Sequence, residues 1–131
     1  IPITKEQKVI MTKQYRFGSQ EVSLETPGGM VDAGEDALSA AIRELKEETG
    51  YGSDEVHEIG KISPNPALMS NYTYIYVAYN AEKRGDQQLD NMEDIEVLEV
   101  DLNQIPTLIT KGEIDHSLVI SAFYLLDQFE K

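Results

Sequence analysis

Three glutamates that fall within about one turn of a predicted helix are the residues of this sequence best suited to chemistry. Glu44, Glu47 and Glu48 stand at positions i, i+3 and i+4, so a helix brings their carboxylates onto one face. Like charges at these spacings repel by about 0.2–0.5 kcal/mol per pair, which calls for a compensating cation. Carboxylates are the oxygen ligands that magnesium, manganese and calcium prefer. The cluster therefore predicts a metal site, with a solvated acidic face as the alternative.

The helix that carries the cluster is predicted over residues 35–49. Its apolar residues recur at i, i+3, i+4 and i+7, the spacing of one buried stripe. They are Leu38, Ala41, Ile42 and Leu45. Gly50 is a natural C-terminal stop for this helix. We expect the stripe to face the core and to leave the acidic face free.

Strands surround this helix in the sequence. Runs rich in β-branched and aromatic residues, or with period-two alternation, cover residues 8–17, 21–26, 55–63, 72–80 and 94–102. A short helical turn is predicted within 103–112, and Asp115 is the expected N-cap of a last helix. The buried stripe of that helix is expected to be Val119, Ala122, Phe123 and Leu126. The order predicts an α/β domain with a mixed sheet packed between helices.

The residues around the cluster resemble the signature of the Nudix hydrolases. Starting at Gly29, the sequence shows Gly, five residues, Glu35, seven residues, Arg43-Glu44, and then LKEETGY, which ends at Tyr51. This fits G-x5-E-x7-R-E-U-x-E-E-x-G-U, where U is apolar, with Tyr51 as a looser final U. The resemblance implies the Nudix fold, an α/β/α sandwich with a mixed β-sheet between helices, as a single domain over 1–131.

The resemblance also implies roles for the residues of this box. The expected ligands of Mg2+ or Mn2+ are Glu44, Glu47, Glu48 and the carbonyl of Gly28. Arg43, which we count with the catalytic residues, is expected to pair with Glu35 and to brace the loop against the helix. Gly29 is expected to contact substrate, because a residue without a Cβ lets the backbone pass close to a bound group.

Residues outside the box complete the expected site. Members of this branch often take the general base from the loop before the last strand, which points to Glu93. The alternative is that Glu93 belongs only to a solvated acidic loop, in which case Glu47 is the next candidate for the general base. Arg16 matches a position that often contacts substrate phosphates, although it could be an ordinary surface arginine. Glu25 is a further candidate for the same pocket.

The flanks of the box indicate the substrate class. Pro66 lies sixteen residues beyond Gly50, a mark of ADP-ribose pyrophosphatases, and residues 1–20 and 111–123 also look like that branch. A sister group that hydrolyses GDP-mannose shares most of these features. The resemblance thus implies metal-dependent hydrolysis of a nucleoside diphosphate sugar to a nucleoside monophosphate and a sugar phosphate. The alternatives are a house-cleaning nucleoside triphosphate pyrophosphatase and a nucleotide sensor without catalysis.

Composition limits the other partners. The net charge of −13 argues against nucleic acid and against an anionic membrane, which both favour a basic face. The chain has no cysteine, which suits the reducing cytoplasm where we expect it to work. It opens on "IPITKE" without an initiator methionine, so we expect residues upstream. The resemblance implies a homodimer, and we expect the unprotected apolar "IPI" strand, together with Phe129, to favour one.

The remaining aromatic and imidazole residues are expected to be structural. Tyr72, Tyr74 and Tyr76 alternate along one strand, so we expect them on one face of the core, with base stacking as the alternative. No ligand spacing joins His57 to His116. The loop 65–71, with its small and flexible residues, is the expected rim of the substrate site.

Overall fold

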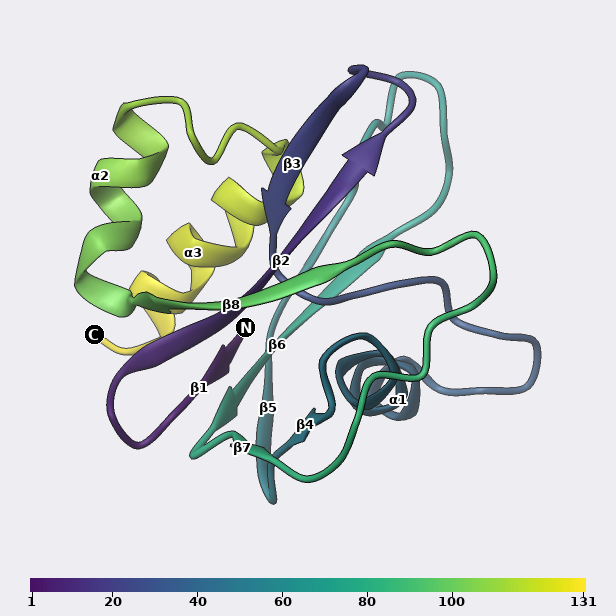
Figure 1. Ribbon diagram of the computed structural model, residues 1–131. Helices are drawn as coiled ribbons and strands as arrows, with labels where there is room; N and C mark the ends of the chain where they lie inside the picture. Colours follow the sequence, from purple (N-terminus) through teal and green to yellow (C-terminus); the bar gives the residue numbers. More distant parts are fainter.

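The computed structural model describes residues 1–131 as a mixed β-sheet with helices on both faces (Figure 1). The strands are β1 (Pro2–Ile3), β2 (Lys8–Arg16), β3 (Glu21–Glu25), β4 (Tyr51–Gly52), β5 (Glu55–Ile62), β6 (Thr73–Tyr79), β7 (Glu82–Lys83) and β8 (Glu96–Asp101). The helices are α1 (Ala37–Thr49), α2 (Ile105–Thr110) and α3 (Ser117–Phe129), with a 3-10 turn at Leu102–Gln104. The predicted α/β class is confirmed. No helix has both the length and the apolar character needed to cross a membrane.

The short strand β1 lies inside the main sheet, whose order is β3-β2-β1-β6-β5, with β8 paired to β2. Ile3 pairs with Val9 of β2 on one side and, in parallel, with Tyr79 of β6 on the other. The expectation of an unprotected N-terminal strand is therefore wrong, because neighbouring strands occupy both edges of β1. A separate two-stranded sheet joins β4 to β7.

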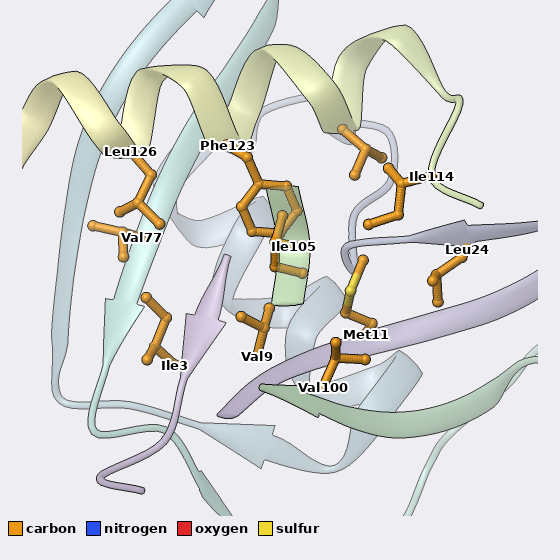
Figure 2. Close-up of a cluster of buried hydrophobic side chains, with 11 residues drawn as sticks. Ile3, Val9, Met11, Leu24, Val77, Val100, Ile105, Ile114, Phe123 and Leu126 are labelled. Atoms are coloured by element: carbon orange, nitrogen blue, oxygen red, sulfur yellow. The ribbon is translucent and has the colours of Figure 1, made fainter. Parts of the chain in front are cut away.

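The main hydrophobic core lies between the sheet and helices α2 and α3 (Figure 2). Val9 and Met11 of β2 point into this cluster, whereas Ile10 and Thr12, also fully buried, alternate with them along the strand. The predicted stripe of α3 is confirmed, since all four of its residues are buried. The full cluster is Ile3, Val9, Met11, Leu24, Val77, Val100, Ile105, Ile114, Val119, Phe123 and Leu126.

Helix α1 covers the opposite face of the sheet; it ends at Gly50 as predicted, but it begins at Ala37, two residues later than the predicted start. The Asp36 carboxylate caps the helix by accepting from the Ser39 N–H at 2.7 Å, and Gly50 ends it at φ 76°. The predicted apolar stripe is partly wrong, however, because Leu38 and Ile42 are 41% and 45% exposed. The buried residues are Ala40, Leu45, Glu48 and Thr49. The helix is turned so that a glutamate faces inward.

Helix α3 is capped by a residue other than the predicted one. The side chain of His116, rather than Asp115, accepts a hydrogen bond from the backbone N–H of Leu118 at 3.2 Å through Nδ1. This cap satisfies one of the free N–H groups in the first turn of the helix. It also fixes the direction in which the imidazole points.

Candidate active site

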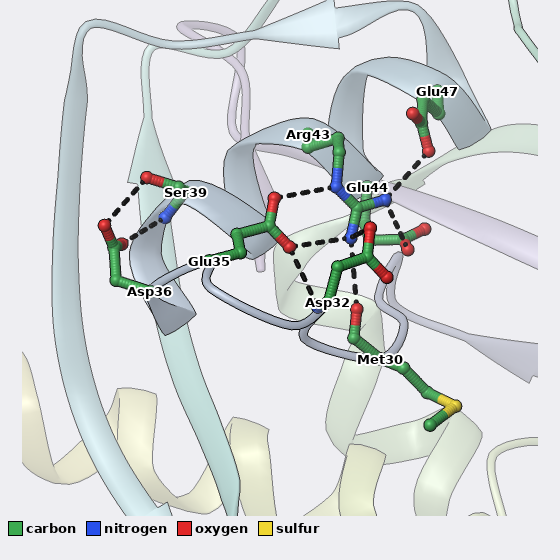
Figure 3. A network of polar contacts seen from close by, with 8 residues as sticks. All are labelled: Met30, Asp32, Glu35, Asp36, Ser39, Arg43, Glu44 and Glu47. Carbon is green, nitrogen blue, oxygen red and sulfur yellow. Dashed lines mark hydrogen bonds and ion pairs between the residues drawn. The ribbon is translucent and has the colours of Figure 1, made fainter.

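Arg43 is the centre of a polar network that ties the loop before α1 to the helix (Figure 3). Its Nε and Nη2 donate to the two carboxylate oxygens of Glu35 at 2.9 and 3.0 Å. Its Nη2 also donates to the carbonyl of Met30 at 3.1 Å, and Glu35 accepts from the Asp32 N–H. The planar guanidinium suits such two-pronged pairing. The structure thus brings the expected pair, Arg43 and Glu35, into direct contact.

Arg43 also contacts two of the three box glutamates. Its Nη1 donates to Glu44 Oε1 at 2.9 Å and to Glu47 Oε2 at 3.1 Å. One guanidinium therefore offsets part of the repulsion between these carboxylates. Glu47 is the most exposed of the box glutamates, whereas the Glu44 side chain is mostly covered.

Glu48, the third box glutamate, is turned into the protein. Glu48 is only 4% exposed, and its Oε2 accepts a hydrogen bond from the backbone N–H of Gly28 at 3.2 Å. Burial raises the pKa of Glu48 to about 7, and the nearby charges of Glu44 and Glu93 act in the same direction. No basic side chain forms an ion pair with it. A buried carboxylate without a cationic partner is a group that a metal ion would stabilise in its charged form.

The glycine pair at the start of the box lies against these carboxylates. A Cβ on Gly29 would collide with the carboxylate of Glu44 in its present position, so any other residue there would require the Glu44 side chain to move. Gly28, whose N–H binds Glu48, has open space where a Cβ would be. The loop therefore runs directly over the acidic side of α1.

The chemistry of the donors fits a divalent cation, although the side chains do not surround a common point. Burial raises the pKa of Glu44 as well as that of Glu48, so both would be charged more readily beside a cation. No three His, Asp or Glu side chains gather tightly enough to form a ready metal site. Arg43 holds Glu44 and Glu47, while Glu48 turns to Gly28.

Glu93 lies in the loop that leads into β8, on the same side as the box glutamates. Its negative charge contributes to the raised pKa values of Glu44 and Glu48, which places it in their electrostatic neighbourhood. Its side chain accepts from the Asp90 N–H at 3.1 Å. The structure therefore brings a carboxylate from a distant part of the sequence toward the box.

Gln87 anchors the loop between β7 and β8, a role that the sequence did not predict. Its side-chain amide donates to the carbonyl of Glu48 at 2.7 Å and to that of Ile95 at 2.9 Å. The backbone N–H of Gln88 also donates to the carbonyl of Glu47. These bonds tie the loop to the C-terminal end of α1. A single glutamine in a polar loop carries no sequence signal for this role.

A cleft of about 730 Å3 opens beside the glycine loop. Its lining includes Arg16, Glu25, Gly28, Gly29, Tyr72 and Tyr74. Arg16 donates from Nε and Nη2 to the two oxygens of Glu25 at 2.7 and 2.6 Å. Burial alone would raise the pKa of Glu25, but the hydrogen bonds from Arg16 hold it below its usual range. The three residues that were expected to contact substrate, Arg16, Glu25 and Gly29, thus all line this cleft.

His116 joins this pair from the start of α3, although the sequence suggested no role for it. Its Nε2 lies 3.9 Å from Glu25 Oε1, and its side chain lines the cleft. Because Nδ1 accepts the hydrogen bond from Leu118, the neutral ring carries its proton on Nε2. The imidazole can therefore donate toward Glu25 or toward a group bound in the cleft.

Comparison with known proteins identifies the class. The NUDIX domain family model matches residues 1–123, and the chain belongs to this family. It is 32% identical over 127 residues to the methanol dehydrogenase activator of Bacillus methanolicus, covering 95% of this chain and 69% of that protein. It is 32% identical over 118 residues to the ADP-ribose pyrophosphatase of Bacillus subtilis (strain 168), covering 87% of this chain and 62% of that protein.

The fold has a close counterpart among solved structures. The crystal structure of an ADP compounds hydrolase superposes with a TM-score of 0.87 at 26% sequence identity. The match covers 98% of this chain and 69% of that chain. The Nudix fold inferred from the box is therefore confirmed. The chain spans about two thirds of the length of these relatives.

Proposed function

We propose that this chain hydrolyses the pyrophosphate bond of a nucleoside diphosphate sugar such as ADP-ribose or GDP-mannose. The observation that carries the proposal is the buried carboxylate of Glu48, which has no ion-pair partner and lies under the glycine loop, whose Gly28 and Gly29 line a cleft of about 730 Å3. The names of relatives support the substrate class, since they include ADP-ribose pyrophosphatases of Bacillus subtilis and Saccharomyces cerevisiae and an ADP-sugar pyrophosphatase of Mus musculus.

The cofactor we propose is Mg2+ or Mn2+. Nudix hydrolases generally use divalent metal ions. The residues that would hold the ion are Glu44, Glu47, Glu48 and the carbonyl of Gly28. When bound, such an ion neutralises pyrophosphate charge and lowers the pKa of water.

The protein's own residues would then direct the hydrolysis. Water attacks one phosphorus, the bond from that phosphorus to the bridging oxygen breaks, and the two monophosphates separate. Glu93 would accept the proton of the attacking water, with Glu47 as the alternative base. Arg16, Glu25 and Gly29 would contact the substrate from the cleft, and Arg43 with Glu35 would hold the loop in place.

The direct test is incubation with ADP-ribose and Mg2+ or Mn2+, followed by an assay for AMP. GDP-mannose and a nucleoside triphosphate complete the panel. AMP release from ADP-ribose, or GMP release from GDP-mannose, is the expected result. Preferred cleavage of the triphosphate would favour the house-cleaning alternative. Tight nucleotide binding without turnover of any compound would favour a sensor and contradict the proposal.

We also propose that the protein is a homodimer, works in the cytoplasm and forms a single Nudix domain over 1–131. The support for a dimer is the exposure of the apolar residues Leu38 and Ile42 on α1, of which Ile42 also lines the cleft. Such patches on a protein surface often mark sites of association. Strand β1 cannot supply a pairing edge, since it lies between β2 and β6.

A further inference from the structure

Two tyrosines that the sequence assigns to the core are open to the cleft instead. Tyr72 and Tyr74 are 55% and 40% exposed, whereas Tyr76 on the same face is 9% exposed. Of the five α1 residues that line the cleft, Ile42 and Leu45 are larger and three are alanines, Ala37, Ala40 and Ala41. Their small side chains leave space above the first half of β6. The expectation of a core face is thus wrong for Tyr72 and Tyr74 and right for Tyr76.

The two exposed rings form a surface together with a lysine from the neighbouring strand. Lys61 pairs with Tyr74 across β5 and β6. Its ammonium lies 4.1 Å from the centre of the Tyr72 ring and 5.5 Å from that of Tyr74. Contacts of this kind between a cation and an aromatic ring are attractive and help to hold the rings in place. We call Lys61, Tyr72 and Tyr74 the aromatic ledge.

We infer that the aromatic ledge stacks the base of the nucleotide substrate. The inference rests on the proposed function and adds to it a base subsite. The same cleft is lined by Gly28 and Gly29, which contact the box glutamates, and by Tyr72 and Tyr74. A nucleoside diphosphate can therefore place its phosphates at the glycine loop and its base on the ledge.

The chemistry of the ledge matches a flat aromatic ligand. Every nucleobase has a π-face, and stacking on an aromatic side chain is favourable for all of them. The Lys61 ammonium adds a hydrogen-bond donor next to the rings. Because stacking depends little on which base is present, the ledge would hold purine and pyrimidine nucleotides with little discrimination.

The test compares the two products of ADP-ribose hydrolysis, AMP, which carries a base, and ribose 5-phosphate, which does not. Inhibition constants of AMP and of ribose 5-phosphate are measured against ADP-ribose hydrolysis. We expect Tyr72→Ala and Tyr74→Ala to raise the constant for AMP by at least about fivefold and to leave that for ribose 5-phosphate unchanged. Tyr72→Phe and Tyr74→Phe retain the rings and should behave like the wild type. Tyr124→Ala, an exposed tyrosine of α3 outside the cleft lining, is the matched control.

Two outcomes would overturn the inference. One is an equal change, or no change, in the two inhibition constants. The other is a shift of the sedimentation profile in Tyr72→Ala with an unaltered ratio of the constants, which would assign the ledge to contact with a second copy. If the wild type hydrolyses no compound, the proposed function fails. AMP and ribose 5-phosphate binding, measured by calorimetry on the same variants, then still tests the ledge.

Discussion

At the scale of single residues, Glu48 has a more strongly raised pKa than Glu44, its neighbour in the box. It is buried, it accepts one hydrogen bond from Gly28, and its pKa is raised to about 7 by burial. Its box neighbours Glu44 and Glu47 are instead paired with Arg43. Replacements at Glu48 therefore test the proposed metal site with the least disturbance of the Arg43 network.

We predict that Glu48→Gln keeps the fold and lowers turnover by about 100-fold or more at saturating Mg2+, since a catalytic metal contributes several kcal/mol. Glutamine still offers an oxygen to the Gly28 N–H, so the loop contact can persist. Steady-state hydrolysis of ADP-ribose and thermal unfolding measure the two effects. Glu113→Gln, at an exposed position without ion pairs, is the control. A rate near that of the wild type would contradict the assignment.

The raised pKa of Glu48 also predicts how the stability of the metal-free protein depends on pH. The folded pKa, about 7, lies above the ordinary glutamate value of 4.5, so the folded state binds the proton more tightly than the unfolded state. Its contribution is fully present below about pH 4.5 and is lost as the pH rises to about 7, by up to about 3 kcal/mol. Denaturant unfolding in EDTA should show this loss in the wild type relative to Glu48→Gln. Parallel profiles of the two proteins would disprove it.

Glu93 tests the proposed general base. We predict that Glu93→Gln lowers the rate by about 100-fold or more and leaves Mg2+ affinity nearly unchanged, because a base acts on the water and a ligand acts on the ion. Single-turnover kinetics and Mg2+ titration separate the two quantities. A decrease smaller than about threefold would mean that the base lies elsewhere, since general base catalysis contributes about 10²–10⁴. Glu47 would be the next residue to replace.

At the scale of elements, the loop from β7 to β8 depends on Gln87 for its place beside α1. We predict that Gln87→Ala lowers stability by about 1–2 kcal/mol, through the loss of two hydrogen bonds, and lowers kcat severalfold with little change in KM. Hydrogen exchange at residues 90–95 should also become faster. Gln128→Ala, whose side chain contacts only Asp127, is the control. A stability loss without faster exchange or reduced kcat would leave Gln87 with a purely structural role.

At the scale of the whole molecule, the position of β1 limits how two copies can associate. Because both edges of β1 are paired, an interface cannot form by strand pairing at β1, and the exposed apolar residues Leu38 and Ile42 of α1 are among the candidates for it. We predict a homodimer at micromolar concentration by analytical sedimentation, weakened in the double variant Leu38→Glu/Ile42→Glu. The variant Phe129→Glu, on α3, tests the other exposed apolar residue that the sequence suggested for a dimer interface. A fully active monomer would contradict the prediction.

The sequence by itself determined the family, the α/β class, the end of α1 at Gly50 and the buried stripe of α3, because spacing along the chain specifies the box residues, a glycine stop and a regular apolar stripe. Only the tertiary structure decided which neighbouring element covers each face of a helix or strand. It turned Glu48 inward beneath Gly28, and it left Tyr72 and Tyr74 exposed in the cleft that α1 also lines. It also placed β1 between β2 and β6. These outcomes depend on contacts between residues far apart in the chain, which the periodicity of a single segment does not encode.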